Sequence, residues 1–291
     1  MTPINNEDGL SEVIGIILII ALIMIFLSIW VIYAVPAEGR QQEISHMDYI
    51  QDWFTQYKIT ADSLWINYDA GERFSTSDIP VSNSIMLGSQ GGATNSGGLF
   101  LALMKPFGSS GTISLNEDGE RLEIRNSTGV VLNENIASIR YEAGNNYWIQ
   151  QTYYYQMGGV FLKQNEGTVN RVAPLISFSS DGGVNSAVIV IIRINNELLE
   201  TAAINGQGPV RIDTAFKGRS NVRSLTSGDL TLGITLMDES AARAWRSILK
   251  ERGGNVNPLS GSEVTITGLD EIHYQYADYT VSLQSVAAGF S

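Results

Sequence analysis

An uninterrupted apolar run near the N-terminus limits what this chain can fold into more than any other feature. Residues 13–35 read VIGIILIIALIMIFLSIWVIYAV, with no ionisable side chain except Tyr33. As an α-helix this run is about 35 Å long, which matches a bilayer hydrocarbon core of about 30 Å. The core helix of a soluble protein is rarely apolar on every side over such a length. Because Trp30 and Tyr33 also fit an interfacial aromatic belt, we predict a transmembrane helix over residues 10–35.

The N-terminal region does not fit a secretory signal peptide. Such a peptide has a basic n-region, a shorter apolar stretch and a small-residue cleavage site after that stretch. The polar N-terminal segment of this chain ends instead in Glu7-Asp8-Gly9 and is followed by Leu10-Ser11-Glu12-Val13-Ile14-Gly15. This layout resembles the class III signal peptide of archaeal type IV pilins and pseudopilins. The resemblance implies a leader of residues 1–9, cut by a prepilin-type peptidase between Gly9 and Leu10, with the helix retained in the mature protein.

Two residues at the start of the helix are candidates for assembly with other pilin-like subunits. Helices associate in lipid through close packing, which the small residue Gly15 allows. The helix dipole favours a carboxylate at Glu12, and after cleavage this carboxylate could pair with a neighbour's new amino group or lie among lipid headgroups. The resemblance places the C-terminal domain outside the cell. Flanking charge does not settle the orientation, because Arg40 is the first basic residue of the chain.

Beyond the membrane the sequence predicts a second, amphipathic helical segment over residues 36–70. Pro36 lacks a backbone donor and should kink or interrupt the helix near the membrane surface. Apolar residues then recur at helical spacing, which predicts one buried seam. They are Met47, Ile50, Phe54, Tyr57, Ala61 and Leu64. We expect the seam to pack on the β domain of its own chain, with a contact between subunits as the alternative.

Residues 71–291 change to short alternating runs separated by turn residues, which predicts one β-rich extracellular domain. We expect a flexible loop at residues 88–98, a hairpin turn at Asp118-Gly119, and a central strand at residues 186–194. Further strands are predicted at residues 210–216 and 230–236. A short helix capped by Asp238 should follow and end before Gly253, and two last strands, at residues 264–266 and 272–283, should complete the domain.

The predicted sheet region also resembles that of larger archaeal pilin-like proteins. Residues 136–162 alternate aromatic or β-branched side chains with polar ones. The resemblance rests on an ordered set of short motifs. They are Tyr141, Gly144-Asn145, Gln151-Thr152-Tyr153 and Gly158-Gly159-Val160.

The composition argues against several classes of function. A net charge of −12, from 18 Lys+Arg and 30 Asp+Glu, leaves little basic surface for nucleic acid, so we expect no such partner. The chain has no cysteine, and its two histidines, His46 and His273, lack the spacing of a zinc site or a hydrolase triad. We therefore expect no enzyme activity, cofactor or metal. One sequon, Asn126-Ser127-Thr128, lies in a predicted turn and is a candidate for glycosylation if the domain is outside.

The sequence thus predicts an α+β protein with one long N-terminal transmembrane and amphipathic helix, a mostly antiparallel β-rich domain and one short helix. The leading interpretation is a pilin-like or pseudopilin-like subunit of an archaeal type IV pilus-like filament, in a minor or adhesive role. Its partners would be membrane lipid, the prepilin-type peptidase and other pilin-like subunits. The alternative is a solitary single-pass binding protein that does not polymerise. An ectoenzyme remains only if polar residues converge in the fold.

Overall fold

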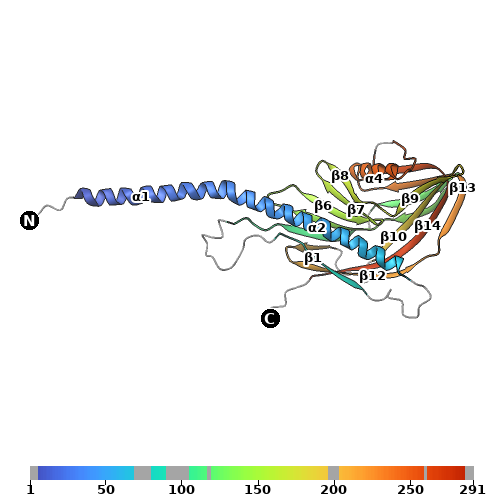
Figure 1. Cartoon of the computed structure of the whole chain (residues 1–291), viewed down its shortest axis with the longest axis horizontal. Helices are drawn as coiled ribbons and strands as arrows, with labels where there is room; N and C mark the ends of the chain where they lie inside the picture. The colour runs from blue at the N-terminus through green and yellow to red at the C-terminus, as the bar shows by residue number, and fades with distance from the viewer. Residues whose placement is uncertain are drawn as a thin grey trace, which may run out of the picture.

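The computed structural model describes residues 6–68, 80–89, 105–116, 119–195, 203–258 and 261–285. In this part of the chain a long helical rod projects from a β-rich domain and ends inside it (Figure 1). The predicted α+β class is confirmed, because the long apolar helix precedes two mainly antiparallel sheets and one short helix. The loop predicted at residues 88–98 lies outside the described residues beyond Ser89, and so does Asp118.

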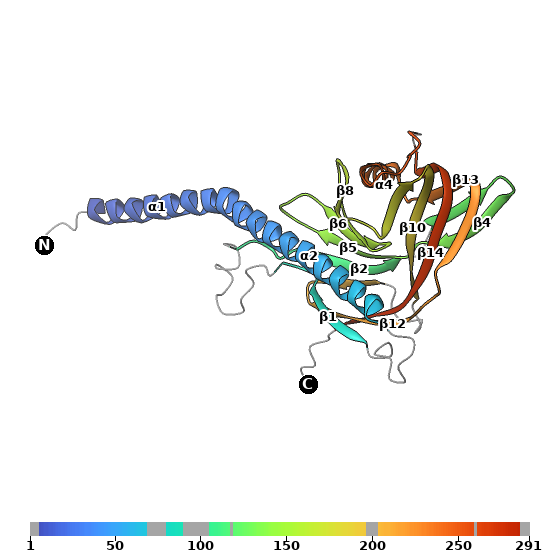
Figure 2. The same cartoon turned by 45° about the vertical axis from the view of Figure 1, so that its right-hand side comes forward.

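The rod consists of α1 (Asn6–Ile29), a π-helical turn (Trp30–Ala34) and α2 (Val35–Ile66). In the π-helical turn the backbone N–H of Val35 donates to the carbonyl of Trp30, five residues earlier. Pro36 explains this widened turn, because it has no N–H and its ring would crowd the carbonyl four residues before it. The rod bends here (Figures 1 and 2). The interruption predicted near Pro36 is therefore confirmed, one turn before the proline.

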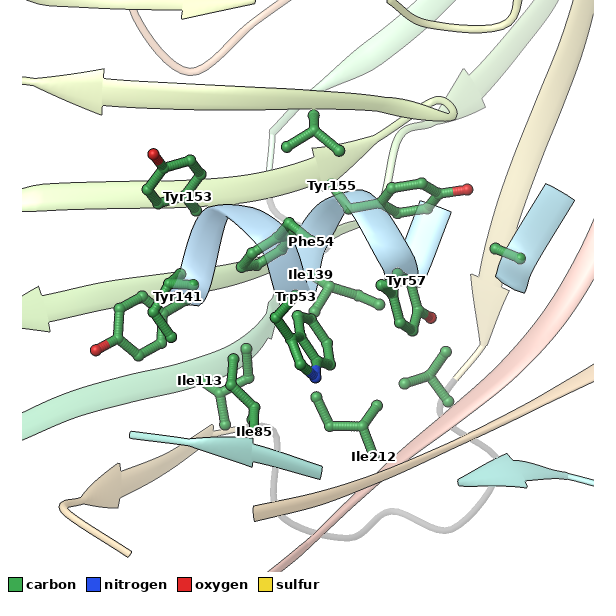
Figure 3. Close-up of a cluster of buried hydrophobic side chains, with 14 of the residues drawn as sticks. Trp53, Phe54, Tyr57, Ile85, Ile113, Ile139, Tyr141, Tyr153, Tyr155 and Ile212 are labelled. Atoms are coloured by element: carbon green, nitrogen blue, oxygen red, sulfur yellow. The ribbon is translucent and has the colours of Figure 1, made fainter. Parts of the chain in front are cut away.

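The second half of the rod forms the centre of the main hydrophobic core. Five of the six predicted seam residues are buried and the sixth, Leu64, packs partly buried against them. Figure 3 shows Trp53, Phe54 and Tyr57 of α2 surrounded by apolar side chains from several strands. The predicted packing of the seam on its own domain is confirmed. The helix ends at Ile66, slightly before the predicted end, with Asn67 as its C-cap.

Within the described residues, the larger sheet has eight strands, ordered β1-β12-β14-β13-β3-β4, with β10 paired to β14 and β9 paired to β10. The pair β10 and β14 is parallel, and the other described pairs of this sheet are antiparallel. Its strands are β1 (Val81–Met86), β3 (Arg121–Asn126), β4 (Gly129–Asn135), β9 (Ile176–Asp181), β10 (Val184–Asn195), β12 (Pro209–Arg219), β13 (Arg223–Thr235) and β14 (Glu263–Ser285).

The smaller sheet is antiparallel throughout its described pairs, in the order β11-β2-β5-β6-β7-β8. Its strands are β2 (Ser110–Asn116), β5 (Ser138–Gly144), β6 (Gln151–Gln156), β7 (Gly159–Gln164), β8 (Gly167–Val172) and β11 (Ala203–Gly206). The motif region of residues 136–162 therefore forms three adjacent strands of one sheet, as its alternating pattern predicts.

A second core lies under the short helix α4 (Glu239–Glu251). Asp238 caps this helix by accepting a hydrogen bond from the backbone N–H of Ala241 at 2.8 Å, as predicted. Trp245 is fully buried, stacks on Phe161 with ring centroids 5.2 Å apart, and donates through Nε1 to Gln156. The helix thus packs against both sheets.

Three sequence predictions about the strands need correction. The hairpin predicted at Asp118-Gly119 is wrong. Gly119 has a positive φ of 79°, but β2 and β3 do not pair: β2 pairs with β5 and β11 in the smaller sheet, and β3 pairs with β13 and β4 in the larger one. The two last strands are one, since β14 continues through Gly268 and bulges where β13 shifts register. Strand β10 lies between β9 and β14, but Val188 is 46 % exposed, so one of its faces is partly open.

Candidate functional site

The apolar half of the rod projects from the domain (Figure 1). Most of its large side chains are exposed, and none of its most apolar window is buried. Leu22 is 70 % exposed and Tyr33 is 72 % exposed. Apolar surface on this scale is unfavourable in water, so the segment has to be covered by lipid or by other protein. The long apolar helix therefore indicates a membrane anchor or a signal sequence.

The residues predicted for processing and assembly all lie on α1. Gly9 and Leu10 lie within the helix rather than in an extended segment, and their side chains are outside the described part. Glu12 is exposed, and a Cβ added at Gly15 would meet nothing within 4 Å. Since the two residues are three positions apart, they share a helix face that is open to a second molecule.

The junction between the rod and the domain depends on a carboxylate that the sequence analysis missed. Glu43 is fully buried, and its two oxygens accept backbone N–H groups from the loop between β5 and β6. The donors are Asn146 at 2.6 Å, Tyr147 at 2.8 Å and Trp148 at 2.6 Å. Hydrogen bonds to an ionised acceptor are the strongest of the ordinary kinds, and three on one group fix the loop to the helix.

Two neighbouring contacts strengthen this junction one turn closer to the apolar half of the rod. Gly39 is buried, and a Cβ there would collide with the ring of Tyr147 and lie 2.9 Å from Pro106, so only glycine permits this close approach. The guanidinium of Arg40 lies 4.2 Å from the centroid of the Trp148 ring, which is the geometry of a cation–π contact.

The Gly144-Asn145 motif explains how the loop presents three N–H groups in one direction. Asn145 donates from Nδ2 to the carbonyl of Ile149 at 2.9 Å, and Gln150 donates from Nε2 to the carbonyl of Asn145 at 2.7 Å. These bonds close the loop on itself. The sequence does contain a clue to the role of Glu43. This residue lies four positions before Met47, so it continues the buried seam of α2 towards the N-terminus. A charged side chain at a buried position must be paired, which points to a partner for Glu43.

The two histidines lie far apart and in different surroundings. His46 is buried beside a cleft of about 400 Å³, and its Nε2 is 3.2 Å from the hydroxyl of Tyr141. Burial lowers the pKa of His46, while the backbone near Leu87 and the charge of Glu43 act in the opposite direction. His273 lies in β14, with Nδ1 2.8 Å from the Ser224 hydroxyl.

Polar side chains do not gather into a catalytic or metal-binding arrangement in the described residues. No group of three His, Asp or Glu side chains there is placed to hold a metal ion. The cleft beside His46 is lined by Gln41, Gln42, Ser45, His46, Tyr49, Met86, Gly88 and Ser89. The described lining residues of this cleft include no carboxylate beside the imidazole.

The candidate glycosylation residue lies in the predicted turn, which the structure forms as the β3–β4 hairpin. The side-chain Oδ1 of Asn126 accepts from the N–H of Thr128 at 2.9 Å, from its hydroxyl at 2.7 Å and from the N–H of Gly129 at 3.0 Å. Ser127 and Thr128 are exposed, so the tip of the hairpin is accessible. Whether Asn126 carries a glycan stays a prediction.

The fold and the junction together define a class: an α+β domain of two sheets whose core helix continues into a largely exposed N-terminal apolar helix, a membrane anchor or signal sequence. The chain belongs to a family of unknown function, DUF7289, whose model matches residues 109–282. The match begins just before β2 and ends within β14, so it covers most of the β domain and omits the rod. No curated protein and no solved structure matches the chain.

Proposed function

We propose that this chain is a pilin-like, single-pass membrane subunit of an archaeal type IV pilus-like filament, with its β domain outside the cell. The observation that carries the proposal is the division of one continuous rod: the large apolar side chains of its first half are mostly exposed, and its second half forms the core of the domain. A simple anchor needs no rigid connection to the domain. A filament subunit does, because its helix must hold the domain at a fixed position.

Processing is the first step of this proposal. A prepilin-type peptidase would cut between Gly9 and Leu10, which releases the leader and leaves the span intact. The new N-terminus would then put Glu12 in the first helical turn, where the N–H groups without helical partners favour a carboxylate. Because Gly9 and Leu10 lie within α1, the peptidase would have to open the first turns of the helix before cutting.

Assembly is the second step. In lipid, the hydrophobic effect does little to drive two apolar helices together, so their association depends on close van der Waals packing. Gly15 has no side chain, which allows the backbone of a neighbouring helix to approach. The carboxylate of Glu12 lies on the same face and would meet the positive amino terminus of a neighbouring subunit. We assign the chain no catalytic role and no cofactor, and its net charge of −12 disfavours nucleic acid as a partner.

Mass spectrometry of the native N-terminus tests the processing step. The mature protein should begin at Leu10 and retain the whole apolar run. A surface-located protein that keeps Met1, or one that begins beyond Val35, would contradict the proposal. Protease added to intact cells should cut the β domain, whereas full protection of that domain would place it inside.

The assembly step is tested by comparing Glu12→Ala and Gly15→Leu with wild type in membrane and sheared-filament fractions. Both variants should be processed and stay in the membrane while leaving the sheared fraction. Ile17→Leu is the matched control, because Ile17 is 59 % exposed, lies on the opposite face of the helix from Glu12 and Gly15, and the change keeps an apolar side chain. If wild type never appears in sheared material and never crosslinks to other pilin-like subunits, the chain is a solitary membrane-anchored binding protein.

A further inference from the structure

The domain begins to cover the rod at the very end of the apolar run. Val35, the last residue of that run, is 7 % exposed, whereas Tyr33 is 72 % exposed. The run from residue 13 to residue 35 already spans a hydrocarbon core of about 30 Å. If the rod crosses a bilayer, the nearest part of the domain lies in the headgroup layer, which is roughly 5–8 Å thick on each side.

Among the described residues, two loops lie in this part of the domain, and both contact the rod or one another. We call residues 105–108 and 146–149 together the proximal rim. The hydroxyl of Tyr147 accepts from the N–H of Phe107 at 3.2 Å, and Asn146 donates from Nδ2 to the carbonyl of Gly108 at 3.2 Å. Glu43 and Gly39 hold the second loop to the helix, as described above. The rim is therefore a rigid unit at a fixed height above the apolar run.

The rim exposes side chains that suit a lipid interface better than water. Phe107 is 78 % exposed and Ile149 is 42 % exposed, although both belong to hydrogen-bonded loops that could hold polar residues. Lys105 and Arg40 are exposed beside them. Arg40 lies only five residues beyond Val35, about 8 Å along the helix. Aromatic, aliphatic and basic side chains at this depth are the combination that anchors proteins at the membrane interface.

We propose that the proximal rim is a second membrane-binding element, which inserts Phe107 and Ile149 into the interface and brings Lys105 and Arg40 to lipid phosphates. The inference rests on the proposed membrane span. Lipid is favoured over a protein partner by continuity, because the rim contacts α2 at Gly39 and Arg40, within two helical turns of the end of the apolar run. The two cations also oppose the repulsion between an acidic domain and anionic headgroups. Insertion on one side of the rod would fix the tilt and rotation of the domain above the bilayer.

The absence of cysteine makes a direct test simple. Single-cysteine variants Phe107→Cys and Ile149→Cys of the full chain are labelled with an environment-sensitive fluorophore and reconstituted into phosphatidylcholine vesicles, with and without nitroxide-labelled lipid. Val222→Cys is the matched control: Val222 is an exposed apolar residue, 61 % accessible, just after β12. Phe216 of β12 packs on Tyr68, just beyond the far end of α2 and about 40 Å from Arg40 along the rod. The control residue follows β12 and is therefore far from the proximal rim.

The proposal expects blue-shifted emission and several-fold stronger quenching by shallow nitroxides at positions 107 and 149 than at 222. Equal quenching at all three positions overturns it. A blue shift that lipid nitroxides do not quench, and that grows with protein density, also overturns it and indicates a neighbouring copy of the chain instead. Ile23→Cys, in the apolar run, tests the membrane span separately from the rim. Quenching at position 23 by deep nitroxides confirms the span. If position 23 is not quenched, the proposed function itself fails.

The charge component has its own readout. Adding a minor share of phosphatidylglycerol to the vesicles should increase the depth at which the fluorophore at position 149 lies in the bilayer, as measured by nitroxide quenching. Lys105→Glu should abolish this increase. Circular dichroism of each variant checks that the fold is intact. If phosphatidylglycerol leaves the quenching depth unchanged in both backgrounds, the cations do not bind lipid phosphates and that part of the proposal is wrong.

Discussion

Replacing Glu43 tests whether the junction between rod and domain depends on one buried carboxylate. Glu43→Ala removes the acceptor of three backbone N–H groups. Each hydrogen bond to a charged group contributes roughly 1.5–3 kcal/mol, but the terms are not additive. Asn146 is exposed and the next two residues are half-buried, so water can reach part of the freed loop. We therefore expect a loss of about 3 kcal/mol in the free energy of unfolding.

The amide variant sharpens this prediction. Glu43→Gln keeps one oxygen, which can accept two of the three N–H groups, and turns an NH₂ group towards the third. Its expected loss is roughly half that of the alanine variant, about 1.5 kcal/mol. Equilibrium urea unfolding of the full chain in detergent micelles, followed by tryptophan fluorescence, measures both. Hydrogen exchange should show faster exchange at the amides of residues 146–148.

Glu38→Ala is the matched control for this experiment. Glu38 lies on the same helix, is exposed, and accepts from Gln42 at 3.2 Å on the surface. Its removal should change stability by less than about 0.5 kcal/mol. If Glu43→Ala destabilises the protein no more than Glu38→Ala does, the carboxylate does not hold the junction and the reasoning is refuted.

Three further predictions follow from single positions. Gly39→Ala should lower the thermal midpoint, because the added methyl group collides with Tyr147; overpacking of this kind typically costs about 1–3 kcal/mol. Burial lowers the pKa of His46, so its contribution to stability is present above the unfolded value of 6.5 and is lost as pH falls through the folded pKa. His46→Gln should flatten this acid-side loss in urea titrations, and His273→Gln should not. Asn126→Gln should remove any glycan mass from protein purified from its native host, and an unchanged mass would show that the sequon is empty.

The elements with local signals were predictable from the sequence. The 3-4 spacing of the α2 seam and the capping by Asp238 depend on residues within a few turns of one another, and the structure confirms both. The interruption near Pro36 follows from a missing donor, and it too is confirmed. These signals specify which segments fold and which face is buried.

Pairing between distant segments was less predictable. Asp118-Gly119 has the residues of a hairpin turn, but a turn signal does not show whether the following strand returns to its neighbour or crosses to another sheet. Glu43 bonds to residues more than a hundred positions away, so no local pattern identifies its partners. The gap predicted between residues 266 and 272 is part of one strand, because β13 pairs with β14 on both sides of Gly268, at Ile266 and Leu269.

The central position of β14 also dictates an order of events during synthesis. β14 pairs with β10, β12 and β13, and all three are made before it. Until β14 emerges from the ribosome or the export channel, these strands have open edges, and the apolar seam of α2 lacks the part of its covering that β14 supplies. The larger sheet therefore closes late, and the incomplete chain has to be kept from pairing with other chains while the rod is already available for the membrane.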